Sequence, residues 1–449
     1  MFTIPSRAGS TPPRDPHVPP RVMGASLVRP VPRAVEGVPR VVAGAVGAVA
    51  GAARRVRTFS FRALSSVASP SSLSDDYVWT EADPSLQCAC RLTDNFFVRR
   101  LRMHVSFDGT REAFESAYAD ALEGLSEEDI AEILAELRAE RRRRETHFAE
   151  ARERRAFVKA RYRALHPDVF TLNPEAHLDA RFRELASACR RALAESSPKR
   201  ENESTKTTVT NERADVIRQR PAGVFAFPVF SELFCRKLRE ECAHFERSGM
   251  PLTRPNTMND NGLLLFELGM YEKLLDPFVR DYVAPVASAL FGDGDDFSSE
   301  TTETSPTLLE KPKNARRSPG ATTIDHHRSF LVRYDAATDR ELDLAYHYDD
   351  AEITLNVNLG GKFEGGELLF GGSGEDARFE SHVSSSRTPV THREGVGIMH
   401  RGAHCHEATP TESGKRVNLI AWCRSSDARR RRCAMCFRVR ESEPLKLAT

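Results

Sequence analysis

Long hydrophobic runs are absent from this chain of 449 residues, and no stretch approaches the roughly 20 apolar residues that a transmembrane helix needs. An excess of one charge is also absent. The 65 Lys and Arg residues face 64 Asp and Glu residues, and a net charge of +1 gives no overall field to recruit nucleic acid or a membrane. The 9 cysteines are an odd number without the spacing of disulfide-rich domains, which favours a reducing compartment.

The composition that remains, 40% hydrophobic and 29% charged, is that of a soluble protein long enough for two domains and tails. Residues 1–75 form a separate region. Up to Ser74 the chain carries 10 Arg residues but only two acidic residues, Asp15 and Glu36. Such a composition is typical of a transit peptide, which predicts import into a mitochondrion or plastid. The alternative is a disordered N-terminal tail on a cytoplasmic protein.

Residues 77–197 have a helical pattern and are interpreted as a helical accessory domain. Ser126 and Asp129 form a capping-box-like start, and apolar residues follow at helical spacing. The same helix then becomes intensely charged, with Glu and Arg at spacings that favour a solvated, salt-bridged face over a phosphate-binding one. Residues 198–218 are polar and are predicted to be a linker.

Residues 219–440 are predicted to form the catalytic domain. Ser231 is expected to cap a helix that Gly249 ends, and a second helical stretch is expected at residues 270–291. Residues 292–320 are rich in Asp, Ser, Thr and Lys, and we interpret them as a disordered insertion. Short strands between glycine turns are expected at 329–334, 353–359, 367–370, 396–400 and 417–424.

Several short strands without intervening helices suit a jelly-roll. The predicted fold class is therefore α+β. A jelly-roll catalytic domain with flanking helices follows the helical accessory domain and the disordered N-terminal tail.

The chemistry is expected near His347 and Asp349, which stand two residues apart ahead of a predicted strand. Successive strand side chains point to opposite faces, so these two residues can point at the same spot. Two ligands hold a divalent metal poorly, and the third is sought among His400, His404 and His406, which alternate along one predicted strand face. Two His and one carboxylate with the opposite positions open are the arrangement of non-haem Fe(II) oxygenases.

Arg416 stands at the head of the next apolar run. A buried Arg in the same pocket as the metal ligands would pair bidentately with a carboxylate, and 2-oxoglutarate carries one at its far end.

The ordered set resembles the Fe(II)- and 2-oxoglutarate-dependent dioxygenases of the prolyl and lysyl hydroxylase type. Their motif is His-X-Asp, a distant His, and an Arg ten residues after that His, which selects His406 as the third ligand. FLVRYDAATDRELDLAYHYDD and HEATPTESGKRVNLIAW also resemble the procollagen lysyl hydroxylase catalytic domain. Residues 88–436 are similar to the 2-oxoglutarate and iron-dependent oxygenase domain-containing family, through CACRLTDNFFV, RPNTMNDNG and CAMC as well as the core.

The resemblance implies a double-stranded β-helix, Fe(II), 2-oxoglutarate as co-substrate, dioxygen, and ascorbate to return Fe(III) to Fe(II). It further implies that Tyr334 hydrogen-bonds the co-substrate carboxylate, against the alternative of an ordinary half-buried aromatic residue. Asn356 shares the alternation of Thr354 and points opposite to Leu355, so it is expected to face the same site, where lysyl hydroxylases also have an Asn. The expected reaction is prolyl 4-hydroxylase-like: hydroxylation of a Pro or Lys side chain in a protein or peptide, while 2-oxoglutarate becomes succinate.

Two other functions stay open. One is demethylation of another substrate class. Nucleic-acid demethylases of this type usually carry a second Arg six residues after the co-substrate Arg, where this chain has Trp422. The other is a catalytically inactive scaffold that keeps the iron and 2-oxoglutarate site. The sequence does not specify the substrate or the oligomeric state.

Four cysteines frame the family-like region. Cys88 and Cys90 form a CxC pair, and Cys433 and Cys436 form a CxxC pair. Four thiolates would make a structural zinc site that ties the accessory domain to the catalytic domain. CxC is a poor chelate spacing, however, and the favoured alternative is four unpaired thiols.

Overall fold

The computed structural model describes residues 77–195, 216–219, 221–291, 323–373 and 387–438. The predicted transit peptide or tail at 1–75, most of the predicted linker at 198–218, and the predicted insertion at 292–320 lie outside the described residues. Within the described part, no helix combines the length and the apolar character needed to cross a membrane.

One long helix and a series of shorter ones make up the helical part. Helix α4 runs over Glu127–Arg161, and its predicted capping box is confirmed. The Asp129 amide donates to Ser126 Oγ at 3.1 Å, and the Ser126 amide donates to Asp129 Oδ2 at 3.3 Å. The other α-helices of the part of the chain that the structure describes are α1 Cys90–Thr93, α2 Arg111–Ala117, α3 Ala119–Leu122, α5 Pro174–His177, α6 Ala180–Glu195, α8 Glu232–Arg247, α9 Leu265–Leu268, α10 Asp276–Phe278, α11 Ala284–Phe291 and α12 Ser426–Arg431.

Short turns of other helix types connect them. In the described ranges, three are 3-10 turns: η2 Thr80–Ala82, η3 Pro84–Leu86 and η4 Pro167–Phe170. Two are π-helical, η5 Tyr271–Leu275 and η6 Val279–Val283, and with α10 and α11 they make the predicted helical stretch at 270–291 continuous.

All the strand pairs among the described residues are antiparallel, and they fall into three groups. The small β1 Phe96–Val98 and β2 Met103–Val105 pair only with each other. The larger sheet has the order β3-β4-β12-β8-β14-β6-β5, and β9 adds to β14. The smaller sheet has the order β11-β10-β13-β7. The strands of the two sheets are β3 Arg218–Gln219, β4 Phe225–Pro228, β5 Gly262–Leu264, β6 His326–Asp335, β7 Leu344–His347, β8 Ile353–Asn358, β9 Phe363–Gly365, β10 Leu368–Ser373, β11 Thr388–Val390, β12 Val396–Arg401, β13 His404–Ala408 and β14 Thr411–Arg424.

Strand β8 shows why the larger sheet has two different faces. All six of its residues are buried. Ile353, Leu355 and Val357 belong to the large hydrophobic core that the helices cover, whereas Thr354 and Asn356 point to the opposite face, as the predicted alternation requires. That opposite face meets the smaller sheet, and the two sheets form the predicted jelly-roll.

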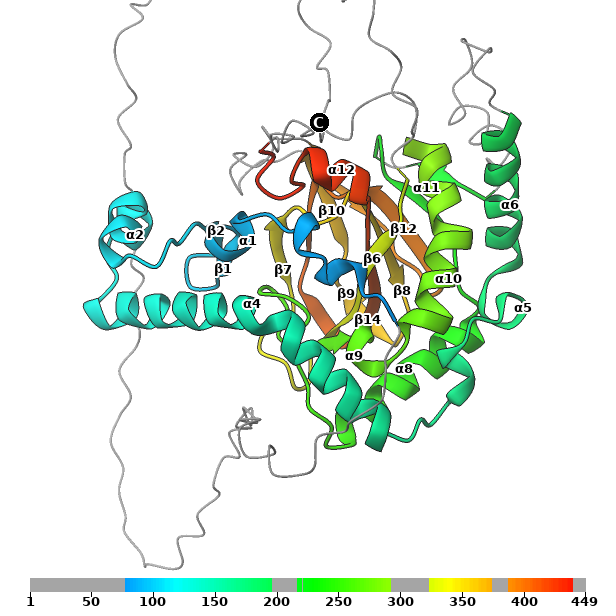
Figure 1. Ribbon diagram of the computed structural model, residues 1–449, viewed down its shortest axis with the longest axis horizontal. Helices are drawn as coiled ribbons and strands as arrows, with labels where there is room; N and C mark the ends of the chain where they lie inside the picture. Colours follow the sequence, from blue (N-terminus) through cyan, green and yellow to red (C-terminus); the bar gives the residue numbers. More distant parts are fainter. Residues whose placement is uncertain (1–76, 196–215, 220, 292–322, 374–386, 439–449) are drawn as a thin grey trace, which may run out of the picture. The chain divides into compact units, whose positions relative to one another are not determined.

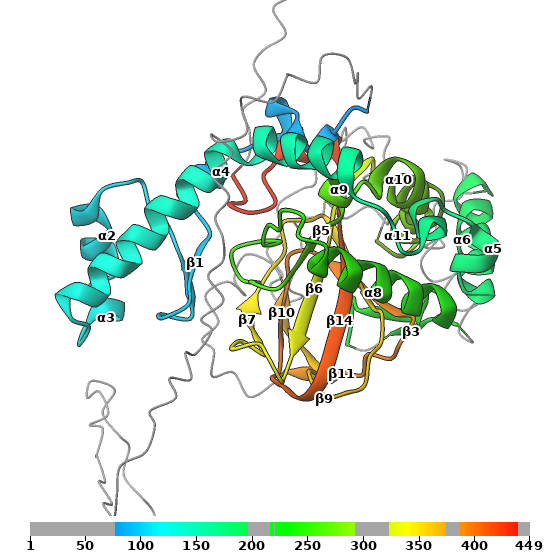
Figure 2. The same cartoon turned by 90° about the horizontal axis from the view of Figure 1, so that it is seen from below.

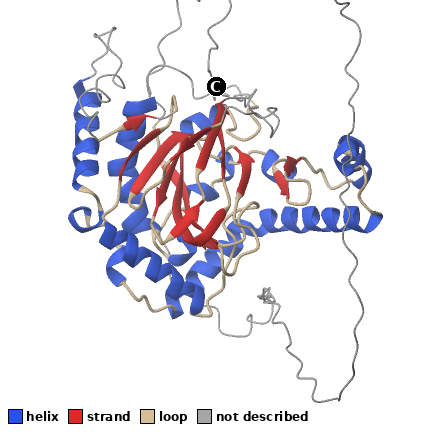
Figure 3. Cartoon of the chain, turned by 180° about the vertical axis from the view of Figure 1, so that it is seen from behind, coloured by secondary structure: helices blue, strands red, loops and turns tan. Residues whose placement is uncertain are grey.

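Helices α6, α8 and α11 gather on one side of the strands, away from β7 and β10 (Figure 1, Figure 2). They bury aromatic residues against the larger sheet: Phe182 of α6 stacks on Phe227 of β4, with ring centroids 5.6 Å apart. Seen from behind, the strands of the two larger sheets form one block that helices flank, and the small β1–β2 pair lies apart from it (Figure 3). Residues of the smaller sheet, from β7, β10 and β13, line the cavity of the site described below.

The hydrophobic packing divides the chain at a different place from the predicted boundary near residue 197. One core contains Val158 of α4 and Phe182 of α6 together with the catalytic strands. A second, smaller core joins β1 and β2 to the first half of α4, through residues such as Phe96 and Ile133. Helix α4 is thus shared, because its first half serves the small core and its second half packs on the jelly-roll.

The end of α4 is fixed to the jelly-roll by buried polar groups. Arg154 Nη2 lies 2.9 Å from Glu267 Oε1 in α9, and both side chains are buried. Arg155 Nη1 donates to the Phe266 carbonyl oxygen at 2.7 Å. If the end of α4 moved away from α9, the buried charges would lose their partners, which is costly. The ion pair therefore holds this end of the helix in place.

Candidate active site

The first two site residues lie at the end of β7 rather than at the start of the next strand. His347 is the last residue of β7, and Asp349 lies in the turn before β8. The Asp349 amide donates to the Gly402 carbonyl oxygen at 2.8 Å, which fixes this turn against the loop between β12 and β13. The sequence pattern did not predict β7, because the strand is only four residues long.

The three candidate histidines do not share one strand, contrary to the sequence prediction. His400 lies in β12 of the larger sheet, whereas His404 and His406 lie in β13 of the smaller sheet, with Gly402 in the turn between them. A Cβ at Gly402 would lie 1.9 Å from the Ala351 carbonyl oxygen, so the chain changes sheets at the residue that has no side chain. His406 is the register partner of His347.

The structure brings together the side chains of His347, Asp349 and His406. Their exposed fractions are 8%, 4% and 5%. Asp349 Oδ1 lies 3.4 Å from His347 Nε2, and Asp349 Oδ2 lies 3.8 Å from His406 Nε2. One ligand atom from each residue lies within 4.8 Å of the others, so the three can hold a single metal ion.

Hydrogen bonds around the three residues leave the ligand atoms free for a metal. Nδ1 of His347 lies 2.7 Å from the Ala345 carbonyl oxygen, and Nδ1 of His406 lies 3.0 Å from the His404 carbonyl oxygen. A proton on each Nδ1 directs the Nε2 lone pair into the site, as metal-binding histidines require. The Thr354 hydroxyl donates to Asp349 Oδ2 at 2.6 Å and orients the carboxylate.

The protonation states also suit a divalent cation. Burial opposes ionisation of Asp349, but its electrostatic interactions with His406 and His347 outweigh it, and the pKa of Asp349 lies well below its usual range. Burial holds the pKa of His406 well below its usual range. The site therefore presents an ionised carboxylate and a neutral imidazole, which are the forms that bind a metal.

The other two histidines also contact backbone carbonyl oxygens, but they lie outside the ligand cluster. His404 Nε2 lies 3.0 Å from the Gly371 carbonyl oxygen, and His400 Nδ1 lies 2.7 Å from the Arg401 carbonyl oxygen. Burial lowers the pKa of His400 to about 4. Neither residue joins the cluster of possible metal ligands.

Arg416 and Tyr334 face the same cavity from neighbouring strands. They are register partners in β14 and β6. Arg416 is 2% exposed, and burial lowers its pKa. Among the described residues no carboxylate lies within ion-pair distance of its guanidinium, and its Nε has no hydrogen-bond partner. A buried cation without an internal counterion can bind an anionic ligand.

Tyr334 is buried and not half-exposed, and its hydroxyl donates to Asn259 Oδ1 at 2.8 Å. Asn259 is itself held by Asn256, whose Oδ1 accepts from the Asn259 side chain at 3.0 Å and from its amide at 2.9 Å. Both asparagines belong to the segment RPNTMNDNG, which carries part of the family resemblance. The structure places two of its asparagines in the wall of the site.

Asn356 faces the cavity, as the alternation predicted, and accepts a hydrogen bond from Asn418 at 2.6 Å. Asn418 was not predicted as a site residue. The signal was available, because Asn418 follows Arg416 by two residues on the same strand and therefore points to the same face. Asn418 Oδ1 has no partner in the described part of the chain and is available to a ligand.

The cavity has a volume of about 230 Å³ and is lined by all six predicted site residues. One wall comes from outside the two sheets: Arg91 and Asn95 lie ahead of β1, and His147 and Phe148 belong to α4. The four framing cysteines are gathered in one cluster, and Cys88, Cys90 and Cys433 line the same cavity. The helical region thus contributes directly to the site.

We expect Tyr334→Phe to raise the KM for 2-oxoglutarate about fivefold, the equivalent of one hydrogen bond of about 1 kcal/mol, with little change in kcat. The change removes only the hydroxyl that positions Asn259 or meets the co-substrate. Steady-state succinate formation at varied 2-oxoglutarate measures both constants. An unchanged KM with a lower free energy of unfolding would make Tyr334 a purely structural residue.

Comparison with known proteins finds relatives that match most of the chain. A family model described as the OGFOD2-like domain matches residues 158–295. The 2-oxoglutarate and iron-dependent oxygenase domain-containing protein 2 of Xenopus tropicalis is 34% identical over 376 residues, which cover 82% of this chain and 93% of that protein. The human protein of the same name is 33% identical over 356 residues, covering 78% and 89%.

A crystal structure of a Pseudomonas putida prolyl-4-hydroxylase covers 49% of this chain and 98% of its own, at 13% identity and a TM-score of 0.30. The identity and coverage of the relatives decide the family. The chain belongs to the 2-oxoglutarate and iron-dependent oxygenase domain-containing proteins, and it is a dioxygenase that uses Fe(II) and 2-oxoglutarate.

Proposed function

We propose that the enzyme hydroxylates a protein side chain, and that proline fits its site better than lysine. His347, Asp349 and His406 hold Fe(II), and Arg416 holds the far carboxylate of 2-oxoglutarate. The observation that carries the proposal is Arg416 itself: a buried guanidinium without an ion-pair partner in the described chain lines the same cavity as the three ligands.

The residues fit the iron and its co-substrate. Bound Fe(II) supplies the activation of dioxygen that decarboxylates 2-oxoglutarate to succinate and inserts an oxygen atom into a substrate C–H bond. Arg416 binds and orients the co-substrate, and the Tyr334 and Asn418 groups supply polar partners near it. Phe330, Val332 and Ile420 form an apolar side of the pocket and exclude water from the co-substrate.

The size of the cavity favours a macromolecular substrate. Pockets for whole small molecules usually measure about 300–1,000 Å³. The present cavity of about 230 Å³ must hold 2-oxoglutarate as well as the target group. A protein substrate would stay outside the cavity and insert only one side chain, which needs little of this volume.

The charge of the lining favours proline over lysine. Seven arginines but only four acidic residues line the cavity, and one of these acids, Asp349, belongs to the iron site. Two others, Glu81 and Asp350, are already paired with arginines. Of the four, only the Asp94 carboxylate has no arginine partner and no place in the iron site within the described chain, so a lysine ammonium would find little negative charge and would lie near a divalent cation. An uncharged pyrrolidine ring has no such cost.

The position that carries a second Arg in nucleic-acid demethylases holds Trp422. Its ring packs edge-on against Phe330, with centroids 4.9 Å apart. The pair carries no positive charge to attract a phosphate backbone, which also supports a protein substrate.

The test has two stages. Iron-loaded enzyme with 2-oxoglutarate, dioxygen and ascorbate should form succinate slowly without substrate. Mass spectrometry of proteins from cells with and without the enzyme should then find prolines that gain one oxygen atom only when the enzyme is present. Folded, iron-loaded protein that forms no succinate would indicate the inactive scaffold. Marks on lysine, or formaldehyde released from methylated nucleic acid, would overturn the substrate class.

A further inference from the structure

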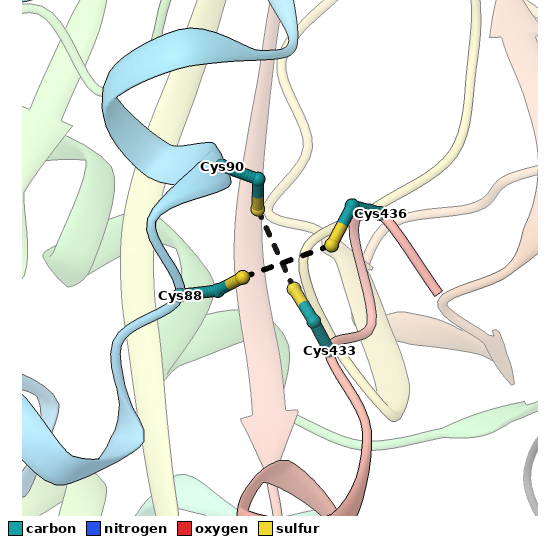
Figure 4. A group of neighbouring side chains, drawn as sticks. All are labelled: Cys88, Cys90, Cys433 and Cys436. Carbon is teal, nitrogen blue, oxygen red and sulfur yellow. Dashed lines mark hydrogen bonds between the residues drawn. The ribbon is translucent and has the colours of Figure 1, made fainter. Parts of the chain in front are cut away.

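Four cysteine sulfurs from opposite ends of the described chain meet in one cluster (Figure 4). Cys88 Sγ lies 3.7 Å from Cys436 Sγ, and Cys90 Sγ lies 3.6 Å from Cys433 Sγ. All four sulfur atoms lie within 4.8 Å of one another. Cys88 and Cys90 stand at the start of α1, and the other two follow α12. The four thiols are free of disulfides, as the favoured alternative expected, but they lie together in one place.

The distances match a single tetrahedral ion. Zinc–sulfur bonds of about 2.3 Å place the corners of a tetrahedron about 3.8 Å apart, close to the two separations observed. Disulfide sulfurs lie only about 2.0 Å apart, and the two pairs are far outside that distance. A cluster of several iron atoms binds its cysteines on different irons, which spreads the sulfurs further than a compact tetrahedron.

The turn that carries Cys433 and Cys436 is shaped for a thiolate. The Met435 amide lies 3.4 Å from Cys433 Sγ and points a donor at it. The Phe437 amide donates to the Cys433 carbonyl oxygen at 2.9 Å, and Phe437 itself adopts a left-handed φ of 56°. Donors aimed at a sulfur stabilise the negative charge that a metal-bound thiolate carries. A non-glycine residue held in this conformation shows that the turn is tightly constrained.

The surroundings favour a closed, structural site. Cys90 and Cys433 are buried, and Cys88 and Cys436 are half-buried. Four protein ligands leave no position for water, which is the arrangement of structural rather than catalytic zinc. Zinc also binds such a site more tightly than Fe(II) does, following the general affinity order of divalent metals.

We propose that Cys88, Cys90, Cys433 and Cys436 bind one structural zinc ion, separate from the iron site. The ion fastens the segment ahead of α1 to the turn after α12, at the rim of the active-site cavity.

The same cluster reaches the iron-binding segment through one side chain. The hydroxyl of Tyr348, which lies between His347 and Asp349, is 2.9 Å from the Met435 carbonyl oxygen inside the CxxC turn. It is also 2.9 Å from Asn95 Oδ1, in the segment that follows α1. Zinc would therefore hold both partners of Tyr348 and secure the wall of the cavity next to the iron site.

Metal content of the full chain tests the proposal. Because the iron site can itself take up zinc, the protein is prepared with Asp349→Ala, which disables that site. We expect one zinc ion per chain by elemental analysis. Adding Cys433→Ser and Cys436→Ser should lower the zinc content at least about tenfold, because two thiolates cannot hold the ion. Adding Cys235→Ala and Cys242→Ala instead, two buried cysteines of α8, should leave it unchanged.

A second measurement does not depend on the cysteine variants. Cobalt exchanged into the Asp349→Ala chain should give the absorption of a tetrahedral tetrathiolate complex. The metal should also protect four cysteines, identified by peptide mass spectrometry as 88, 90, 433 and 436, from alkylation. Protein without zinc, zinc that survives loss of both thiolates, iron in place of zinc, or disulfides between these cysteines would each overturn the proposal.

Discussion

Replacing His406 by glutamine should lower iron-dependent succinate formation at least about 100-fold, because even partners of metal ligands cost 10- to 100-fold when they are lost. The same replacement at His404 should leave most of the activity. The two residues are both buried in β13 and stand two positions apart. Only His406 shares a cluster with His347 and Asp349, whereas His404 Nε2 is turned to the Gly371 carbonyl oxygen.

The two variants form a matched pair, since each removes one imidazole and adds one amide in the same strand. Succinate formation and iron bound per chain are measured for both, together with the free energy of unfolding of the metal-free proteins. Similar stabilities with iron lost only in His406→Gln support the assignment. If His404→Gln loses iron and His406→Gln keeps it, the proposed ligand set is wrong.

The sequence predicted the chemistry of this site more fully than its local structure. Alternation along a single strand correctly placed Asn356 on the inner face of β8, because successive side chains of a regular strand point to opposite faces. Spacing and resemblance together selected His406. The same alternation failed for His400 and His404, because Gly402 turns the chain from one sheet to the other and periodicity cannot detect a change of sheet.

Contacts between distant segments were beyond local pattern. Cys90 and Cys433 are separated by 343 positions, and no periodicity relates them. Asn259 lies in a loop ahead of β5, where neither strand nor helix spacing indicates a direction for its side chain. Helix α4 appeared to belong to one accessory domain, because its charged sequence hides the fact that Arg154 and Arg155 are buried against the jelly-roll.

Replacing Arg416 by glutamine should raise the KM for 2-oxoglutarate at least about 30-fold, since loss of a buried charge partner costs about 2–5 kcal/mol. The effect on kcat should be smaller, because the residue lies at the far end of the co-substrate. Lys415→Gln is the matched control: it removes one positive charge from the preceding position, where the side chain is 39% exposed. Its KM should stay close to that of the native enzyme.

Stability separates a binding role for Arg416 from a structural one. A buried guanidinium without a carboxylate partner opposes folding, so the ligand-free Arg416→Gln variant should be at least as stable as the native protein. Added 2-oxoglutarate should raise the melting temperature of the anaerobic native enzyme and of Lys415→Gln, but not that of Arg416→Gln, because stabilisation by a ligand follows its affinity. An Arg416→Gln variant that melts lower and yet keeps its KM would show that the guanidinium supports the fold, and the co-substrate carboxylate would then have to bind elsewhere in the cavity.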